Sequence, residues 1–321
     1  MIHLRAVISI VACLMAASTI FAADPYPTRP IKMIVGFAPG GGTDLTARPI
    51  ALKMSELMGQ QVLVENRPGA AGNIATEQVA RAAPDGYTIL MGTIAALAIN
   101  PSLYGNLKFD PETDFAPVIQ CVDATNVLVL HPSVPANSVQ ELIALAKQKS
   151  LSAGSSGIGA TGHLSIELFN LMAGVKLVHV PYKGGGPAMT DLVGGQVQLV
   201  FATTASAIPQ IKAGRIKGIA VTTARRSSLM PDLPTISEAG LAGFDANNWY
   251  GIVVPAKTPR PIIDQLNAEV TKILHMEDVK ATLHNQGLDP APGTPEQFGA
   301  YIHSERIKWA KVIKASGAKA E

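Results

Sequence analysis

The chain has 321 residues, of which 47% are hydrophobic and 16% are charged, and its formal net charge at pH 7 is +2. This composition supports a large buried core and excludes a disordered chain, and the nearly balanced charge gives no sign of a nucleic-acid-binding surface. The length suits two domains.

The N-terminus has the pattern of a secretory signal peptide. A short basic segment, Met1–Arg5, is followed by the apolar run Ala6–Phe21 and by small residues at Ala22 and Ala23. This pattern predicts cleavage near Ala22 or Ala23 and export of the mature chain to the periplasm. Retention as a membrane anchor is the weaker interpretation, because polar residues interrupt the run and it is shorter than the roughly 20 apolar residues of a spanning helix.

The two cysteines of the chain are Cys13 and Cys121. The residues around Cys13 resemble a lipoprotein cleavage site, but the apolar run before it is too short to favour lipidation. Removal of the signal leaves Cys121 without an intramolecular disulfide partner, so we expect stability to come from burial of the core.

Short apolar runs alternate with helical patterns along the mature chain. Each expected strand is short, rich in β-branched residues and bounded by Gly, Pro or polar residues. The expected strands are Ile31–Phe37, Gln61–Glu65, Tyr87–Gly92, Val118–Val122, Asn126–Leu130, Leu177–Val180, Val197–Ala202, Ile216–Thr222 and Tyr250–Val254. The expected helices are Asp44–Met58, Asn73–Ala82, Val139–Lys149, Gly162–Met172, Pro187–Val193, Ile208–Ala213, Pro261–His275, Asp278–Asn285 and Pro295–Ala315. This alternation predicts an α/β fold with mostly parallel sheets.

Two extended stretches, Cys121–Val129 and Phe244–Tyr250, are where we expect the chain to cross between two lobes. The expected parts are a signal peptide at 1–22, the first part of lobe 1 at 23–124, lobe 2 at 125–244, and a return segment of lobe 1 with the C-terminal helices at 245–321. Ligands of open parallel sheets bind beyond the carboxyl ends of the strands, so we expect a ligand cleft between the lobes.

A glycine-rich loop, GFAPGGGTDLTAR, follows the first expected strand. No lysine follows its glycines, as a phosphate-binding P-loop requires. Glycines let a ligand approach the backbone, and the free N–H groups at the helix start carry partial positive charge, which together predict an anionic ligand. The alternative is a plain βα turn in which Asp44 only caps its helix. The candidate contacts are Phe37, Gly41, Gly42, Thr43 and Asp44.

A second loop of this kind, SAGSSGIGATGHLSIELF, lies in the other expected lobe. Hydroxyl and N–H groups converge where its helix begins. The formal G-x-G-x-x-G match from Gly157 to Gly162 does not indicate a dinucleotide site, because the preceding strand is poor and no ribose-binding acid follows. The candidate contacts are Ser155, Ser156, Thr161 and His163, and His163 is equally well explained as an ordinary helix-start histidine.

Other loop residues complete the expected walls of the cleft. They are Gly72 and Asn73 before a helix, Thr93 after a strand, Lys183 in VPYKGGGPA, and Thr204 after another strand. Each of these alone is more often an ordinary turn or cap residue than a ligand contact.

Five segments resemble, in order, the recurring signatures of the Bug family, the extracytoplasmic solute receptors of tripartite tricarboxylate transporters. They are GFAPGGGTDLTAR, VENRPGAAGNIATEQVARAAPDGYTILMGT, FDPETDFAPV, GATGHLSIELF and VPYKGGGPAMTDLVGGQV, and they span nearly the whole mature chain. The resemblance implies a two-lobed, type II periplasmic-binding-protein fold that closes over a small carboxylate and delivers it to the membrane subunits of the transporter.

The resemblance also implies which residues hold the carboxylate, largely through backbone groups, hydroxyls and bound water. Carried onto this chain, they are Gly41, Gly42, Thr43 and Asp44 on one side, and Ser155, Ser156, Thr161 and His163 on the other. The chain departs from many relatives at Thr203 and Thr204, where they carry an aspartate or asparagine. This departure disfavours an amino-acid ligand and leaves di- and tricarboxylates and aromatic acids. We expect a monomer without a cofactor or a nucleic-acid partner.

Two alternatives remain beside a transport receptor. A receptor used for sensing would bind its ligand in the same way. An exported hydrolase is disfavoured, because no G-x-S-x-G motif is present. FDPETDF lacks the glycine and the final glutamate of a calcium loop, and no paired histidines or C-x-x-C motif indicate a transition metal. We therefore expect a binding protein rather than an enzyme.

Overall fold

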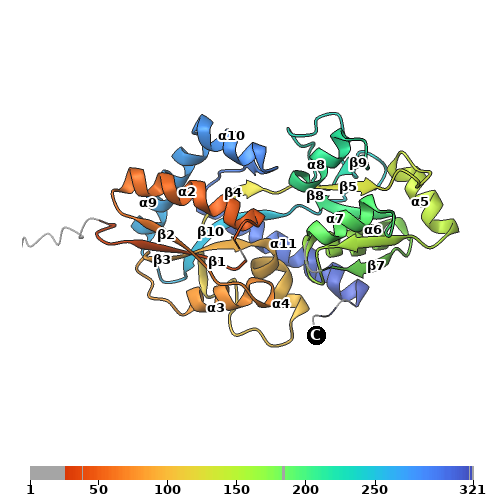
Figure 1. Cartoon of the computed structure of the whole chain (residues 1–321). Helices are drawn as coiled ribbons and strands as arrows, with labels where there is room; N and C mark the ends of the chain where they lie inside the picture. The colour runs from red at the N-terminus through yellow and green to blue at the C-terminus, as the bar shows by residue number, and fades with distance from the viewer. Residues whose placement is uncertain (1–25, 38, 183–184, 318, 320–321) are drawn as a thin grey trace, which may run out of the picture.

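The structure, a computed structural model, describes residues 26–37, 39–182, 185–317 and 319. The expected signal peptide with its cleavage site, Cys13 and Lys183 lie outside the described residues. Two β-sheets lie side by side, and helices pack against each of them (Figure 1). The expectation of a two-lobed α/β fold is confirmed.

The first sheet has the strand order β11-β4-β10-β3-β1-β2. Its strands are β1 (Ile31–Val35), β2 (Val62–Asn66), β3 (Thr88–Thr93), β4 (Phe115–Asp123), β10 (Trp249–Pro255) and β11 (Asp289–Pro290). Along β1, Met33 and Val35 pack in one apolar core cluster, whereas Ile34 packs in another. Because side chains alternate along a strand, this division shows that the sheet is covered on both faces.

The second sheet has the strand order β7-β6-β8-β5-β9. Its strands are β5 (Asn126–Leu130), β6 (Ser152–Ser155), β7 (Val178–Pro181), β8 (Leu199–Thr203) and β9 (Lys217–Val221). The chain changes sheet between β4 and β5 and returns between β9 and β10. The lobe boundaries at 124/125 and 244/245 fall in these two connections and stay a prediction.

Both sheets are mixed rather than mostly parallel. β1 pairs in parallel with β2 and β3, and β6 pairs in parallel with β7 and β8. In contrast, β10 is antiparallel to β3 and β4, and β5 is antiparallel to β8 and β9. These two strands are the first that the chain forms after it crosses from the other lobe. A strand buried on both faces is apolar throughout whatever its direction, so the sequence pattern could not reveal this reversal.

The helices cover the faces of the sheets with ends shifted by a few residues from the expected ones. They are α2 (Gly42–Met58), α3 (Asn73–Ala80), α4 (Asn100–Leu103), α5 (Val139–Gln148), α6 (Thr161–Ala173), α7 (Gly185–Val193), α8 (Thr204–Lys212), α9 (Arg260–Leu274), α10 (Glu277–Asn285) and α11 (Pro295–Ser316), with the short helical segments η1 (Ala70–Gly72) and η2 (Ala95–Ile99). The sequence analysis did not predict η2 and α4, because the apolar residues of this segment are consecutive and lack the spacing of an amphipathic helix. Within the described ranges, no helix is both long enough and apolar enough to cross a membrane.

The C-terminal helix α11 contacts both lobes. Near its start, the ring of Phe298 packs edge-on against Trp249 of β10, with ring centroids 5.4 Å apart. Farther along, Trp309 is completely buried and belongs to the same core cluster as Phe169 of α6 in the second lobe. The long helix therefore runs from the first lobe to the second, as Figure 1 shows.

Candidate ligand-binding cleft

The glycine-rich loop connects β1 to α2 at the carboxyl end of β1. Helix α2 begins at Gly42, and its N-cap Gly41 has an extended backbone, with φ −80° and ψ 164°. Glycine has no side chain with which to accept a hydrogen bond from the first turn, and no side-chain cap forms at Gly41. The N–H groups of that turn carry the positive end of the helix dipole. An anion can therefore take the place of the missing cap.

Asp44, in the first turn of α2, is buried, and its carboxylate is used within the lobe. Oδ2 accepts from the Gly40 N–H at 2.9 Å and from Arg48 Nε at 2.8 Å, and Oδ1 accepts from Asn66 Nδ2 at 2.9 Å. Burial raises the pKa of this carboxyl, but the hydrogen bonds outweigh burial and hold the pKa below its ordinary value. These contacts are those of a residue that fixes the loop, and a direct ligand contact of Asp44 stays a prediction.

Tyr250 of β10 lies against the start of α2. A Cβ atom on Gly42 would lie 2.7 Å from Tyr250 Oη, so a larger residue at 42 requires the ring to move. Asn248 Nδ2 donates to Tyr250 Oη at 3.1 Å, and the Thr43 hydroxyl also bonds to it. The sequence analysis missed this role of Tyr250. The residue lies in a strand more than 200 positions after the glycine loop, and no sequence pattern connects the two.

The neighbouring loop between β2 and α3 has an unusual backbone. Ala70 and Ala71 have positive φ angles of 47° and 52°, a region that non-glycine residues seldom occupy. Such conformations cost on the order of 1 kcal/mol or more each, and they persist only where the surrounding structure imposes them. The turn brings Gly72 against the first loop, since a Cβ on Gly36 would lie 2.8 Å from Gly72 Cα. Strain of this kind is typical of ligand sites.

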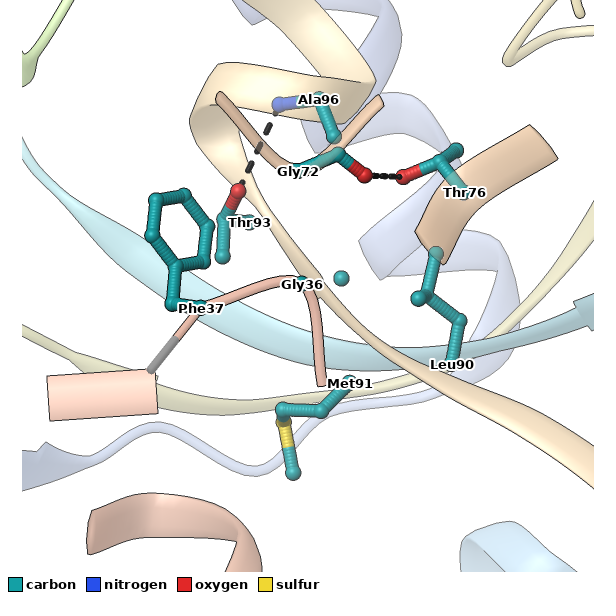
Figure 2. Close-up of a pocket in the computed structure, with 9 residues that line it drawn as sticks. Gly36, Phe37, Gly72, Thr76, Leu90, Met91, Thr93 and Ala96 are labelled. Carbon is teal, nitrogen blue, oxygen red and sulfur yellow. Dashed lines mark hydrogen bonds between the residues drawn. The ribbon is translucent and has the colours of Figure 1, made fainter. Parts of the chain in front are cut away.

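Three of the predicted residues meet at the carboxyl ends of β1 and β3, as Figure 2 shows. Phe37, Gly72 and Thr93 line one pocket there. The Ala96 N–H donates to the Thr93 hydroxyl at 3.4 Å, so this side chain supports the start of η2. The space between these residues is too narrow to hold a water molecule. These residues therefore form a packed junction between loops, not a chamber that could enclose a ligand.

Two other candidates, Asn73 and Thr204, form hydrogen bonds away from this junction. Asn73 Oδ1 accepts from Asn100 Nδ2 at 2.6 Å, which links α3 to α4 within the first lobe. Thr204 is completely buried at the start of α8, and its hydroxyl donates to the carbonyl oxygen of Gly287 at 2.8 Å. Because Gly287 lies between α10 and β11, this bond joins the two lobes.

Ser155, at the end of β6, is buried beneath the second glycine-rich loop. Its hydroxyl lies 2.6 Å from His179 Nε2, and it accepts from the Gly157 N–H at 3.2 Å. A histidine can activate a serine nucleophile, but the exposed fraction of Ser155 is 0%, so no substrate can reach it. The pair therefore supports the loop. The role of His179 was missed, because no motif or spacing connects it with Ser155.

His163 supports the same loop from the first turn of α6. Its Nδ1 accepts from the Gly159 N–H at 3.1 Å, and its ring stacks on that of His179. Burial, with a smaller contribution from His179, lowers the pKa of His163 to about 4, and burial also lowers the pKa of His179. Both rings are therefore neutral at pH 7, and neither adds a positive charge to the cleft.

Ser156 and Thr161 carry two further hydroxyls of this loop. Ser156 is exposed and Thr161 half-buried. Neither hydroxyl forms a hydrogen bond with any described part of the chain. The same loop reaches the first lobe, since a Cβ on Gly159 would lie 2.8 Å from Leu103 Cδ2 of α4. The second glycine-rich loop therefore contacts the first lobe at α4, which directly follows η2 in the chain.

Comparison with known proteins gives a consistent assignment. The model of the tripartite tricarboxylate transporter family receptor matches residues 46–318. BugT of Bordetella pertussis is 36% identical over 322 residues, which cover 99% of each chain. A structure of an R. palustris protein with adipate is 40% identical with a TM-score of 0.81, covering 92% of this chain and 99% of that one.

Two further solved structures extend the comparison. MatC from Rhodopseudomonas palustris with bound malate is 32% identical with a TM-score of 0.77, covering 90% of this chain and 100% of that one. The periplasmic binding protein BugD is 37% identical with a TM-score of 0.78, covering 92% and 100%. The chain therefore belongs to the tripartite tricarboxylate transporter receptor family, whose members are extracytoplasmic solute-binding proteins.

Proposed function

We propose that the chain is a periplasmic receptor that captures a small di- or tricarboxylate, or an aromatic acid, between its lobes and delivers it to the membrane subunits of a tripartite tricarboxylate transporter. Family membership supports this proposal, as do the relatives whose structures contain adipate and malate. The observation that carries it is the uncapped start of α2 at Gly41, because backbone N–H donors and partial positive charge there suit an anion.

In this proposal the ligand carboxylate bonds to N–H groups of the first turn of α2 and to hydroxyls from the opposite loop. Charge-assisted hydrogen bonds satisfy the oxygen lone pairs, which offsets the cost of taking the charge out of water. Arg48, the basic residue of α2 near the loop, is bonded to Asp44. Holding the anion by dipoles rather than by an arginine clamp keeps release possible, as transport requires.

The candidate residues then divide by role. Direct donors are Gly41, Gly42, Thr43, Ser156 and Thr161. Walls and supports are Phe37, Gly72, Asn73, Thr93, Asp44, Ser155 and His163. Thr204 links the lobes through its bond to Gly287, and Lys183 is proposed as a further ligand contact. The receptor acts as a monomer after removal of its signal peptide. Ligand favours the closed form, and the surface composed of both lobes in that form is what the membrane subunits recognise.

A thermal-shift panel tests the binding part of the proposal. The purified mature chain is heated with mono-, di- and tricarboxylates, aromatic acids, amino acids and sugars. A concentration-dependent rise of Tm with one class of acid is expected, because a ligand that binds only the native state raises its apparent stability. A rise with a sugar alone, or with none of the acids, overturns the carboxylate assignment.

Delivery needs a separate test. Uptake of the identified acid is measured in the native host with and without the gene for this chain. Loss of uptake is expected for a transport receptor. Unchanged uptake combined with a lost transcriptional response to the acid would instead identify a sensing receptor.

A further inference from the structure

A second, larger cavity lies on the other side of the two crossovers. It has a volume of about 440 Å³ and is lined from the first lobe by Asp123, Asp289 and Tyr301, and from the second lobe by residues 223–228. We call it the rear cavity. Nothing in the proposed carboxylate site uses these residues.

The strand order separates the rear cavity from the carboxylate cleft. In the first sheet β10 lies between β3 and β4, so the loop after β1 and Asp123 at the end of β4 are on opposite sides of β10. In the second sheet β5 lies between β8 and β9, so the loop after β6 and the loop after β9 are on opposite sides of β5. The two strands that follow the crossovers therefore stand between the two sites.

Two carboxylates in the wall of the rear cavity, those of Asp123 and Asp289, have mostly uncharged hydrogen-bond partners among the described residues. Asp123 Oδ1 accepts from Gln120 Nε2 at 2.6 Å and from Asn247 Nδ2. Asp289 accepts from the hydroxyls of Ser228 at 2.6 Å and Ser227 at 3.2 Å. Over the described ranges, no lysine or arginine forms an ion pair with either carboxylate, although His284 Nε2 lies 3.5 Å from Asp289.

The electrostatic consequence is visible at Asp123. The pKa of Asp123 is raised to about 6, chiefly by burial and in smaller part by the charges of Asp245 and Asp289, against the hydrogen bonds from Asn247 and Gln120. The negative charges of Asp123, Asp245 and Asp289 therefore repel one another around the rear cavity. Asp245 pairs with Lys308 at 3.3 Å, a lysine that also pairs with Glu305. Within the described ranges, Asp123 has no basic side chain paired with it, and Asp289 has only His284.

Two arginines also line the cavity, and within the described ranges neither forms an ion pair with Asp123 or Asp289. Arg226 Nε bonds to Glu238 at 2.9 Å, and Arg225 is exposed. Both lie in the loop after β9.

A buried acceptor also lacks a donor in this wall. Asn247 is 6% exposed, and its Nδ2 is directed to Asp123 and to Tyr301 Oη. Its Oδ1 is buried and has no hydrogen-bond partner in the described parts of the chain. An unpaired buried acceptor is costly, so the described residues leave this wall of the cavity with one unsatisfied polar group.

We propose that the rear cavity is a second binding site, specific for a small organic compound that carries one primary ammonium group. The ammonium donates to Asp123, and its charge offsets those of Asp123 and Asp289. A bare metal ion is the poorer occupant, because the described residues contain no group of three or more His, Cys, Asp or Glu arranged to hold one. The volume lies within the roughly 300–1,000 Å³ of ordinary small-molecule pockets.

Calorimetric titration with 4-aminobutan-1-ol tests the proposal, with butane-1,4-diol as the uncharged analogue. No carboxylate is added, and the pH is set well above the pKa of Asp123. The mature wild-type chain is expected to bind the amine and not the diol. Asp123→Asn and Asp289→Asn are each expected to weaken amine binding by about tenfold or more, because each removes a charge from the site. Asp264→Asn, which removes an exposed carboxylate on α9, is expected to leave it unchanged.

Three results would overturn the proposal. They are no binding of the amine by the wild type, equal binding of the diol, and unchanged amine affinity in both cavity variants. Thermal unfolding of each variant confirms that it is folded, and Asp289→Asn keeps the test available if Asp123→Asn does not fold. Because the carboxylate is absent throughout, failure here leaves the proposed function untouched.

Discussion

His163 stacks on His179, with ring centroids 4.1 Å apart and 21° between the ring planes. The Gly159 N–H donates to His163 Nδ1 at 3.1 Å, so this nitrogen must be unprotonated. Protonation would place a donor against a donor and a charge in a buried stack. The second glycine-rich loop is therefore held by two neutral imidazoles.

Acidification is expected to destabilise the chain through His163. Its pKa is about 4 in the folded protein against an ordinary value of 6.5, so the unfolded state binds more protons between these values. The free energy of unfolding is then intact above pH 6.5 and falls as the pH drops from 6.5 towards 4. Each unit of pKa displacement corresponds to about 1.4 kcal/mol.

The variant His163→Asn isolates this contribution. Asparagine offers an acceptor to the Gly159 N–H but does not titrate. Urea unfolding across the same pH window is expected to show a smaller loss of stability in the variant than in the wild type. Parallel losses in the two proteins would mean that His163 does not carry the effect.

The contact between Gly42 and Tyr250 predicts a rescue. Gly42→Ala places a methyl group 2.7 Å from Tyr250 Oη and should destabilise the chain by about 1–3 kcal/mol, as overpacking does in well-packed sites. Removal of that hydroxyl in Tyr250→Phe should recover part of the loss. A double-mutant cycle from urea unfolding measures the coupling. Strictly additive effects would show that the two residues do not constrain each other.

A large side chain introduced into either glycine-rich loop is expected to abolish carboxylate binding. Ser156 is exposed, so Ser156→Tyr should fill the cleft without disturbing the core. Thr43→Tyr should act in the same way from the first lobe, although Thr43 is buried and the variant must be checked for folding. Titration with the acid from the thermal-shift panel measures the loss. Thr282→Tyr, on an exposed site of α10, is the control, and undiminished affinity in Ser156→Tyr and Thr43→Tyr would remove these loops from the site.

The bond between Thr204 and Gly287 predicts control of lobe closure from outside the cleft. A Cβ on Gly287 would lie 2.5 Å from Ala205 N and from Thr204 Oγ1, across the contact between the lobes. Gly287→Ala should therefore wedge the lobes apart, weaken ligand binding and increase the radius of gyration in small-angle scattering.

A matched control separates the wedge from backbone strain. Gly214 has a φ of 68°, close to the 75° of Gly287, but a Cβ on Gly214 would meet no described atom within 4 Å. Gly214→Ala should lower stability without changing affinity or shape. Equal behaviour of the two variants would contradict the role assigned to Gly287.

The sequence predicted the elements of the fold because their signals are local. Strand Asn126–Leu130 was predicted with its observed ends, since it is a continuous apolar run between polar residues. The weak strand Ser152–Ser155 was not predicted, because its small residues lack β propensity and its parallel pairing with β7 and β8 forms it. The direction of β5 and β10 depends on the end from which the chain enters each sheet. No local sequence pattern indicates that end.

From the sequence, only the glycine-rich loops of the candidate site could be predicted. Gly41 and Gly42 predicted that another group packs closely against the loop backbone. In the structure Tyr250 packs against Gly42. The partners that fix the site come from distant segments, as His179 does for Ser155. Such pairings arise from tertiary packing, so the sequence identified the loops but not what holds them in place.

Helix α11 makes the two lobes mechanically dependent on each other. Besides the two crossovers, it is a third connection, and it is apolar: Phe298 is held by the first lobe while Trp309 is buried in the cluster that includes Phe169 of the second. Any opening of the cleft must slide or bend this helix and expose apolar surface, at about 25 cal/mol per Å². The apolar contacts of α11 therefore limit how far the lobes can separate before a ligand binds.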